Sequence, residues 1–255
     1  MDGAVLEVRE VTRSYGRVPV VRGVTFTLRP GEVCGYLGVN GSGKSTTVRM
    51  LAGLMPPSSG EILYGGKPLD RAYRARLGYV PEEPHLYGHL TGAEYLELAG
   101  GLRGIPDGVL RPRIQGAFEI FQLIGSRDAA IETYSKGMKQ KILLAAALLH
   151  DPDVLILDEP LSGLDVTAVL LVRHVFAALA RQGKIVLHSS HALDMVEKVC
   201  SRVIVLHQGC VVADDSVASL GTLMRLPSLE AIFAELTQQP DLERGAGDLV
   251  SLMRS

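Results

Sequence analysis

The sequence predicts an α/β protein in which helices cover a parallel sheet and a helical segment is inserted into that core. Short apolar runs at 33–37 and 154–157 are typical of buried parallel strands, because such strands are covered on both faces. From 91 to 149, apolar residues recur at helical spacings instead. Strands that alternate with helices through short loops favour a parallel sheet wrapped by helices.

The same two periods place the other elements in chain order. We expect an edge strand at 5–11, where apolar and charged residues alternate, and further strands at 20–28, 33–37, 62–64, 77–80, 154–157, 184–187, 203–206 and 211–212. We expect helices at 44–54, 135–149, 166–181, 192–200, 220–224 and 229–236, with helical spacings also at 94–98, 110–118 and 121–124. These elements predict a single domain over 1–236, with a helical subdomain at about 84–149. We expect the tail at 237–255 to be mobile.

Composition limits the classes of function. With 26 basic and 28 acidic residues the formal net charge is −2, which does not indicate a broad surface for nucleic acid. The three cysteines, Cys34, Cys200 and Cys210, are too few and too scattered for a disulfide framework, so a reducing compartment is expected. The longest apolar run, 142–149, is far shorter than the roughly 20 residues of a membrane span. We therefore expect a soluble chain that reaches a membrane only through a partner.

A glycine-rich loop follows the apolar run at 33–37 and precedes a predicted helix. Residues 38–45 fit the pattern G-x-x-x-x-G-K-[ST], and this strand–loop–helix context is the one that the pattern needs. Glycines let successive backbone N–H groups turn toward an anion, and the helix N-terminus adds its positive dipole end. Lys44 supplies a charge for the outer phosphates and Ser45 a hydroxyl for Mg²⁺. The loop predicts binding of a nucleoside triphosphate.

Two acids end the apolar strand at 154–157. Carboxylates at the carboxyl end of a parallel strand face the same crevice as the phosphate loop. We expect Asp158 to hold Mg²⁺ and Glu159 to orient and deprotonate the attacking water.

The segment before these acids indicates which family of nucleotide-binding proteins the sequence resembles. Residues 134–138 read Tyr-Ser-Lys-Gly-Met, and this stretch resembles the signature Leu-Ser-Gly-Gly-Gln of the ATP-binding cassette (ABC) transporter ATPases. Ser135 and Gly137 match, whereas Tyr134, Lys136 and Met138 depart from the signature; this form resembles the variant of exporter-type cassettes. Ser135 is also a good N-cap, and the helix after it presents free N–H groups to an anion. In this family the anion is the γ-phosphate held by a second subunit, and Lys136 adds positive charge there.

Further positions match the family between residues 5 and 236. Tyr15 resembles the aromatic residue that stacks on adenine, Asp165 the acid of a loop at the dimer interface, and His191 the switch histidine that reaches the γ-phosphate. Glu82 stands where the family usually has glutamine; its carboxylate suits Mg²⁺ but adds negative charge beside the triphosphate. The resemblance implies a P-loop core, an antiparallel β subdomain and an inserted helical subdomain. The nucleotide-binding residues that it implies are Tyr15, Gly38, Asn40, Gly41, Ser42, Gly43, Lys44, Ser45, Thr46 and Glu82.

The resemblance implies an ATPase that uses Mg²⁺ and forms a head-to-tail dimer with a second ATP-binding subunit, identical or different. A membrane-spanning subunit on a separate chain would dock on the helical subdomain and residues 82–90, at the cytoplasmic face of the membrane. Two alternatives remain: an ABC ATPase of DNA repair or translation, and a catalytically weak regulatory cassette. The spacing of the motifs leaves no room for the long insert of repair members. The altered signature and Glu82 keep the regulatory alternative open.

Overall fold

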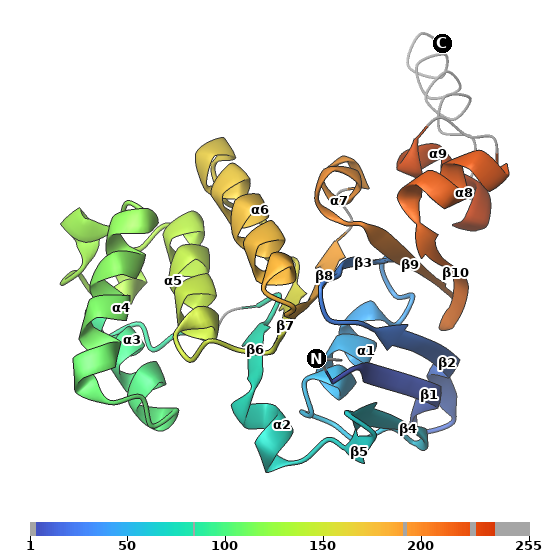
Figure 1. Ribbon diagram of the computed structural model, residues 1–255, viewed down its shortest axis with the longest axis horizontal. Helices are drawn as coiled ribbons and strands as arrows, with labels where there is room; N and C mark the ends of the chain where they lie inside the picture. Colours follow the sequence, from blue (N-terminus) through green and yellow to red (C-terminus); the bar gives the residue numbers. More distant parts are fainter. Residues whose placement is uncertain (1–3, 84, 191–192, 225–227, 238–255) are drawn as a thin grey trace, which may run out of the picture.

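Two sheets and nine named α-helices make up the described part of the chain. The computed structural model describes residues 4–83, 85–190, 193–224 and 228–237 (Figure 1). The larger sheet contains β3 (Val33–Leu37), β6 (Leu77–Val80), β7 (Val154–Asp158), β8 (Ile185–Ser190), β9 (Arg202–His207) and β10 (Cys210–Ser216). The smaller sheet contains β1 (Leu6–Tyr15), β2 (Val18–Leu28), β4 (Ser59–Tyr64) and β5 (Lys67–Pro68).

The six-stranded sheet forms the centre of the fold. Its strand order is β10-β9-β3-β8-β7-β6, in which every pair is parallel except the antiparallel pair of β9 and β10. Every residue of β3, β7 and β8 is buried, as expected for parallel strands covered on both faces. Alternate residues of β7 enter two hydrophobic clusters on opposite faces of the sheet, Val154 and Ile156 in one and Leu155 and Leu157 in the other. Because β9, β3, β8, β7 and β6 run in the same direction, their carboxyl ends lie at the same edge of the sheet.

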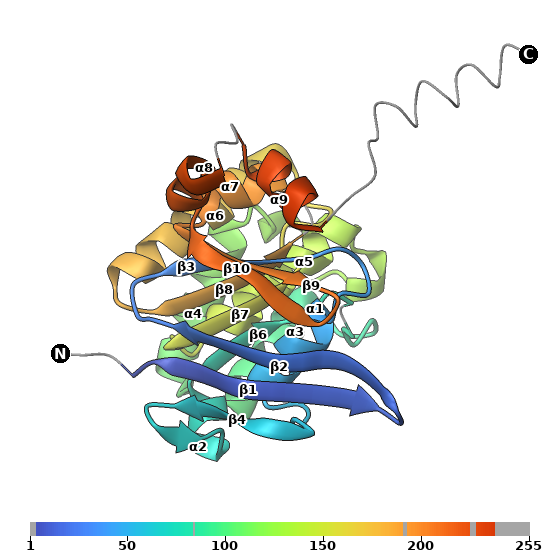
Figure 2. The same cartoon turned by 90° about the vertical axis from the view of Figure 1, so that its right-hand side faces the viewer.

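The four-stranded sheet lies beside the first and is antiparallel, with the order β2-β1-β4-β5 (Figure 2). One face of this sheet packs onto the cluster that also contains Tyr36 and Ile156 of the central sheet. The predicted edge strand at 5–11 is β1, which lies inside the sheet between β2 and β4. The prediction of an edge position was wrong because alternation reports only one buried face, which edge and interior antiparallel strands share.

The helices are α1 (Lys44–Leu51), α2 (Arg71–Ala75), α3 (Gly92–Leu102), α4 (Asp107–Ile120), α5 (Lys136–Leu148), α6 (Val166–Arg181), α7 (Leu193–Val199), α8 (Val217–Met224) and α9 (Leu229–Thr237). Helices α3, α4 and α5 form a lobe beyond β6, and α8 and α9 lie at the opposite end of the molecule (Figure 1). Thr91 and Glu94 form a capping box that fixes the start of α3. Within the described part of the chain, no helix has both the length and the apolar character that a membrane span needs.

Several elements differ from the prediction. The helix expected at 44–54 ends at Leu51, because Gly53 adopts a positive φ of 68°. The spacing at 121–124 belongs to a turn and to the start of a short 3₁₀ helix, Ile124–Ser126. Helix α2 and strand β5 were not predicted, since each spans too few residues for a period to emerge. Strand β8 continues past the predicted 187 to Ser190.

Candidate active site

The loop between β3 and α1 approaches other backbone segments so closely that two positions require glycine. A Cβ atom on Gly38 would lie 2.6 Å from the Leu206 carbonyl oxygen. Gly43 has a φ of 103°, and a Cβ there would lie 2.7 Å from the Val20 carbonyl oxygen. Both positions therefore exclude any side chain. The loop that they shape lies at the carboxyl end of β3, against the start of α1.

Lys44 is held inside this loop. Its side-chain ammonium donates to the carbonyl oxygens of Gly38 at 2.6 Å and Val39 at 3.2 Å, and the residue is only 8% exposed. Burial lowers the pKa of Lys44, and the nearby carboxylates of Glu159, Asp158 and Glu82 oppose that effect without cancelling it. A triphosphate bound here would supply the anion that a buried ammonium favours.

The start of α1 has features of an anion site. Gly43 is its N-cap and has no side chain to satisfy the first N–H groups, and the first turn contains no acidic residue. The hydroxyl of Ser42 is buried and has no hydrogen-bond partner in the structure. The N–H groups, the ammonium and this hydroxyl fit a phosphate group well.

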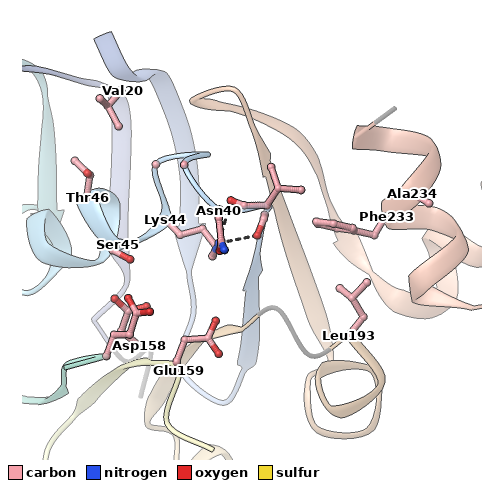
Figure 3. Close-up of a pocket in the computed structure, with 15 residues that line it drawn as sticks. Val20, Asn40, Lys44, Ser45, Thr46, Asp158, Glu159, Leu193, Phe233 and Ala234 are labelled. Carbon is pink, nitrogen blue, oxygen red and sulfur yellow. Dashed lines mark hydrogen bonds between the residues drawn. The ribbon is translucent and has the colours of Figure 1, made fainter. Parts of the chain in front are cut away.

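The two acids predicted after the apolar strand lie across the pocket from the loop (Figure 3). Asp158 is buried, and its carboxylate accepts a hydrogen bond from the Ser189 hydroxyl. Glu159 has a φ of 51°, a conformation unusual for a residue with a side chain, and its N–H donates to the Ser189 carbonyl oxygen at 3.2 Å. The extension of β8 beyond residue 187 therefore fixes both acids through one residue, Ser189.

A pocket of about 760 Å³ joins these groups. Its lining residues are Val20, Gly38, Val39, Asn40, Gly41, Gly43, Lys44, Ser45, Thr46, Glu82, Asp158, Glu159, Leu193, Phe233 and Ala234. Nine of the ten predicted nucleotide-binding residues either line the pocket or, as with Ser42, lie within its loop. Sequence reasoning missed the apolar wall of Leu193, Phe233 and Ala234. An apolar residue far along the chain carries no signal of a binding role, so only the folded chain reveals this wall.

The pocket suits a magnesium ion that is bound partly by protein side chains and partly by the phosphates of a nucleotide, and not by protein side chains alone. Among the described residues, no three His, Cys, Asp or Glu side chains gather into a metal-binding group. The Ser45 hydroxyl and the carboxylates of Asp158 and Glu82 nevertheless line the same pocket. Mg²⁺ is usually bound by one or two carboxylates together with substrate phosphates, so these donors suit Mg²⁺ that arrives with a triphosphate.

Tyr15 and Asp165 do not line this pocket. Tyr15 is 47% exposed at the end of β1, and the guanidinium carbon of Arg13 lies 5.4 Å from its ring centroid. Asp165 caps α6 by accepting from the Ala168 N–H, an interaction that lowers the pKa of its carboxyl group, as does its hydrogen bond from Lys141. His191 lies outside the described residues. The roles expected of these three residues stay predictions.

The signature segment also lies apart from the pocket, at the start of α5. Ser135 is the N-cap of this helix, and its hydroxyl accepts from the Met138 N–H at 3.2 Å. The Lys136 side chain is exposed, but it has a hydrogen-bond partner: its ammonium donates to the Ser162 hydroxyl at 2.8 Å. Gly137 packs so closely that a Cβ atom would lie 2.5 Å from the Gly163 carbonyl oxygen. The predicted N-cap is present, and its ligand-binding role stays a prediction.

The sheet order, the phosphate loop and the two acids define the class as a P-loop nucleotide-binding protein. The family model described as ABC transporter matches residues 21–162. An uncharacterized ABC transporter ATP-binding protein of Nostoc sp. is 41% identical to this chain. The match covers 80% of this chain and 62% of the relative's length. Nod factor export ATP-binding protein I of Paraburkholderia xenovorans is 38% identical, with 86% of this chain and 73% of the relative aligned.

A solved structure described as an ATP-binding subunit of an ABC transporter superposes with a TM-score of 0.86. Its sequence is 34% identical, and the match covers 91% of this chain and 99% of the other. The chain therefore belongs to the ABC transporter family as an ATP-binding subunit, with relatives named for export. The family is one of ATPases, and the fold predicted from the resemblance is confirmed.

Proposed function

We propose that this chain hydrolyses Mg²⁺-bound ATP between two ATP-binding subunits and thereby drives export through separate membrane-spanning subunits. One observation carries the proposal: a single pocket brings Lys44 and the N-terminus of α1 opposite Asp158 and Glu159. Binding and hydrolysis of a triphosphate need both halves of this arrangement.

The residues divide the chemistry between them. The loop N–H groups and Lys44 bind the β- and γ-phosphates, and Ser45, Asp158 and Glu82 hold the metal. Mg²⁺, when bound, neutralises charge on the phosphates. Glu159 accepts a proton from the attacking water, a contribution typically worth about 10²–10⁴ in rate. The hydrogen bond from its N–H to Ser189 holds this residue at the end of β7.

A second subunit completes the site. The described residues that line the pocket do not include Ser135, Lys136, Gly137 or Met138. The N-terminus of α5, capped by Ser135, therefore has its phosphate-binding groups available to the pocket of another chain. Asp165 lies at that interface and His191 reaches the γ-phosphate in this proposal. ATP favours the closed dimer and hydrolysis removes the contacts that close it, as a ligand-driven change between two states requires.

The membrane-spanning partner docks on the α3–α5 lobe and residues 82–90. A groove of about 320 Å³ between this lobe and β6 is lined by Tyr79, Pro81, His85, Tyr95, Ala99, Leu102, Arg103, Leu143, Ala146 and Ala147. Leu102 of this groove is 81% exposed. Tyr87, whose ring centroid lies 6.5 Å from that of Tyr95 in the groove, is 55% exposed, so apolar surface extends beyond the groove. The name of the Nod factor relative, an export protein, supports export over import. The chain would then lie peripherally at the cytoplasmic face of the membrane.

Replacing Glu159 with glutamine tests the proposal. The variant Glu159→Gln keeps the shape of the side chain, so it should bind ATP normally, lose turnover by about 10²-fold or more, and elute as an ATP-dependent dimer. Glu119→Gln, an exposed acid on α4, is the matched control and should behave as the wild type. Unchanged hydrolysis by Glu159→Gln would exclude the assigned role. A wild-type chain that binds ATP without hydrolysing it would favour the regulatory cassette.

A further inference from the structure

The start of α5 is joined to the loop that follows Glu159. We refer to residues 160–165, between β7 and α6, as the 160–165 loop. Lys136 donates to the Ser162 hydroxyl at 2.8 Å, and Lys141 pairs with the Asp165 carboxylate at 3.0 Å. The buried amide of Gln140 donates to the Pro160 carbonyl oxygen at 3.0 Å. Side chains along α5 thus hold the loop at its beginning, middle and end.

The middle contact leads directly to Glu159. The Ser162 N–H donates to the Glu159 carbonyl oxygen at 3.2 Å, which closes the turn after the acid. Glu159 itself has a positive φ, which persists only when surrounding contacts hold it. Lys136 is therefore two hydrogen bonds from the backbone of Glu159. The methylenes of its side chain also pack on Gly163, where a Cβ atom would lie 3.0 Å from the lysine Cγ and Cδ.

We propose that Lys136 is a positioning residue that links the signature segment to Glu159 of the same chain through Ser162. The proposal rests on the proposed function, because it concerns how Glu159 is oriented during ATP hydrolysis. It replaces the expectation that Lys136 contacts the γ-phosphate of the second subunit. The glycine of the family signature lacks a side chain and cannot make this bond, so the link belongs to the altered signature of this chain.

The size of the effect follows from where the bond lies. Lys136 is exposed, so removing its side chain leaves no buried group unsatisfied and should hardly change thermal stability. A hydrogen bond of this kind contributes about 0.5–1.5 kcal/mol, so losing it should reduce kcat by about 2- to 12-fold. The phosphate loop is untouched, so the KM for ATP should stay the same.

A double-mutant cycle on the full chain tests the link by steady-state ATP hydrolysis. Lys136→Ala and Ser162→Ala should each lower kcat, and Lys136→Ala/Ser162→Ala should lower it no further than either single change. Lys136→Arg should restore activity, since arginine can also donate to Ser162. Lys139→Ala combined with Ser162→Ala is the matched control, because Lys139 lies on the same helix. In this pair the fold-changes of kcat from the two single substitutions should multiply.

Two results would overturn the proposal. If the fold-losses of kcat from Lys136→Ala and Ser162→Ala multiplied in the double variant, the two residues would act independently. A raised KM for ATP with unchanged kcat in Lys136→Ala would indicate a phosphate contact instead. Failure of the wild-type chain to hydrolyse Mg²⁺-ATP would remove the proposed function itself, an outcome distinct from normal hydrolysis without coupling.

Discussion

At the scale of single residues, the pocket contains more negative charge than a triphosphate site needs. Glu82 lines it together with Asp158 and Glu159, and all three carboxylates act on the pKa of Lys44. Burial nevertheless lowers that pKa, so the acids do not fully compensate for the loss of water around the ammonium. Glu82 is proposed to hold the metal, yet glutamine, which has no charge, is usual at this position in the family.

The variant Glu82→Gln isolates the charge. It preserves side-chain length and removes one repulsive interaction with the triphosphate, so ATP binding without Mg²⁺ should tighten by about two- to tenfold. Glu83→Gln, at the exposed neighbouring position, is the control and should leave the affinity unchanged. Titration calorimetry with and without Mg²⁺ measures the effect. Weaker binding without Mg²⁺ would contradict the repulsion, and weaker binding only with Mg²⁺ would identify Glu82 as a metal ligand.

His188 predicts a dependence of stability on pH. Its ring is fully buried on β8, with its centroid 5.9 Å from that of the Phe176 ring, and burial lowers its pKa from the usual 6.5 to about 4. The unfolded chain then binds more protons than the folded chain between these values, so stability falls as the pH drops from about 6.5 to 4. The loss attributable to this residue is on the order of 3 kcal/mol.

Urea unfolding at several pH values measures this dependence. His188→Leu should unfold with a shallower pH dependence over the same window, because leucine does not titrate. His89→Leu, which alters an exposed histidine, is the control for the change in composition. An equal dependence in His188→Leu and the wild type would show that other groups control the acid sensitivity.

At the scale of elements, α5 combines a structural cap with a predicted ligand site. The Ser135 hydroxyl accepts a hydrogen bond from the Met138 N–H and so caps the start of α5. The N–H groups at this start are also the ones proposed to bind phosphate. The two roles can be separated because aspartate is as good an N-cap as serine but repels an anion.

Two substitutions at Ser135 therefore give different results. Ser135→Ala should lower the free energy of unfolding by about 1 kcal/mol through loss of the cap. Ser135→Asp should keep the stability of the wild type and yet lose most ATP hydrolysis, because its carboxylate opposes the phosphate. Denaturant melts and ATPase rates measure the two properties separately. Full activity in Ser135→Asp would rule out a phosphate contact at the start of α5.

At the scale of the whole molecule, the signature segment at the start of α5 does not line the pocket of its own chain. Helix α1 and the acids meet at the central sheet, whereas the start of α5 lies in the helical lobe beyond β6 (Figure 1). A head-to-tail pair of chains would place each α5 against the other chain's pocket.

Mixed dimers test this arrangement. Lys44→Ala and Ser135→Asp should each be inactive alone, but a mixed dimer contains one pocket with both an intact Lys44 and an intact partner Ser135. Each mixed dimer should therefore have up to roughly half of the activity of a wild-type dimer, since one of its two sites is complete. If both residues acted within one chain, every site would contain a defect and mixing would restore nothing.

The sequence by itself determined the alternation of strands and helices, the phosphate loop and the pair of acids, because each depends on residues close together in the chain. Periods of two and 3.6 residues report local burial, and the loop pattern reports local backbone geometry. The interior position of β1, the apolar wall of Phe233 and the contact of Lys136 with Ser162 were decided only by the tertiary structure. These features join segments far apart in sequence, and no local period records which distant segment will pack against them.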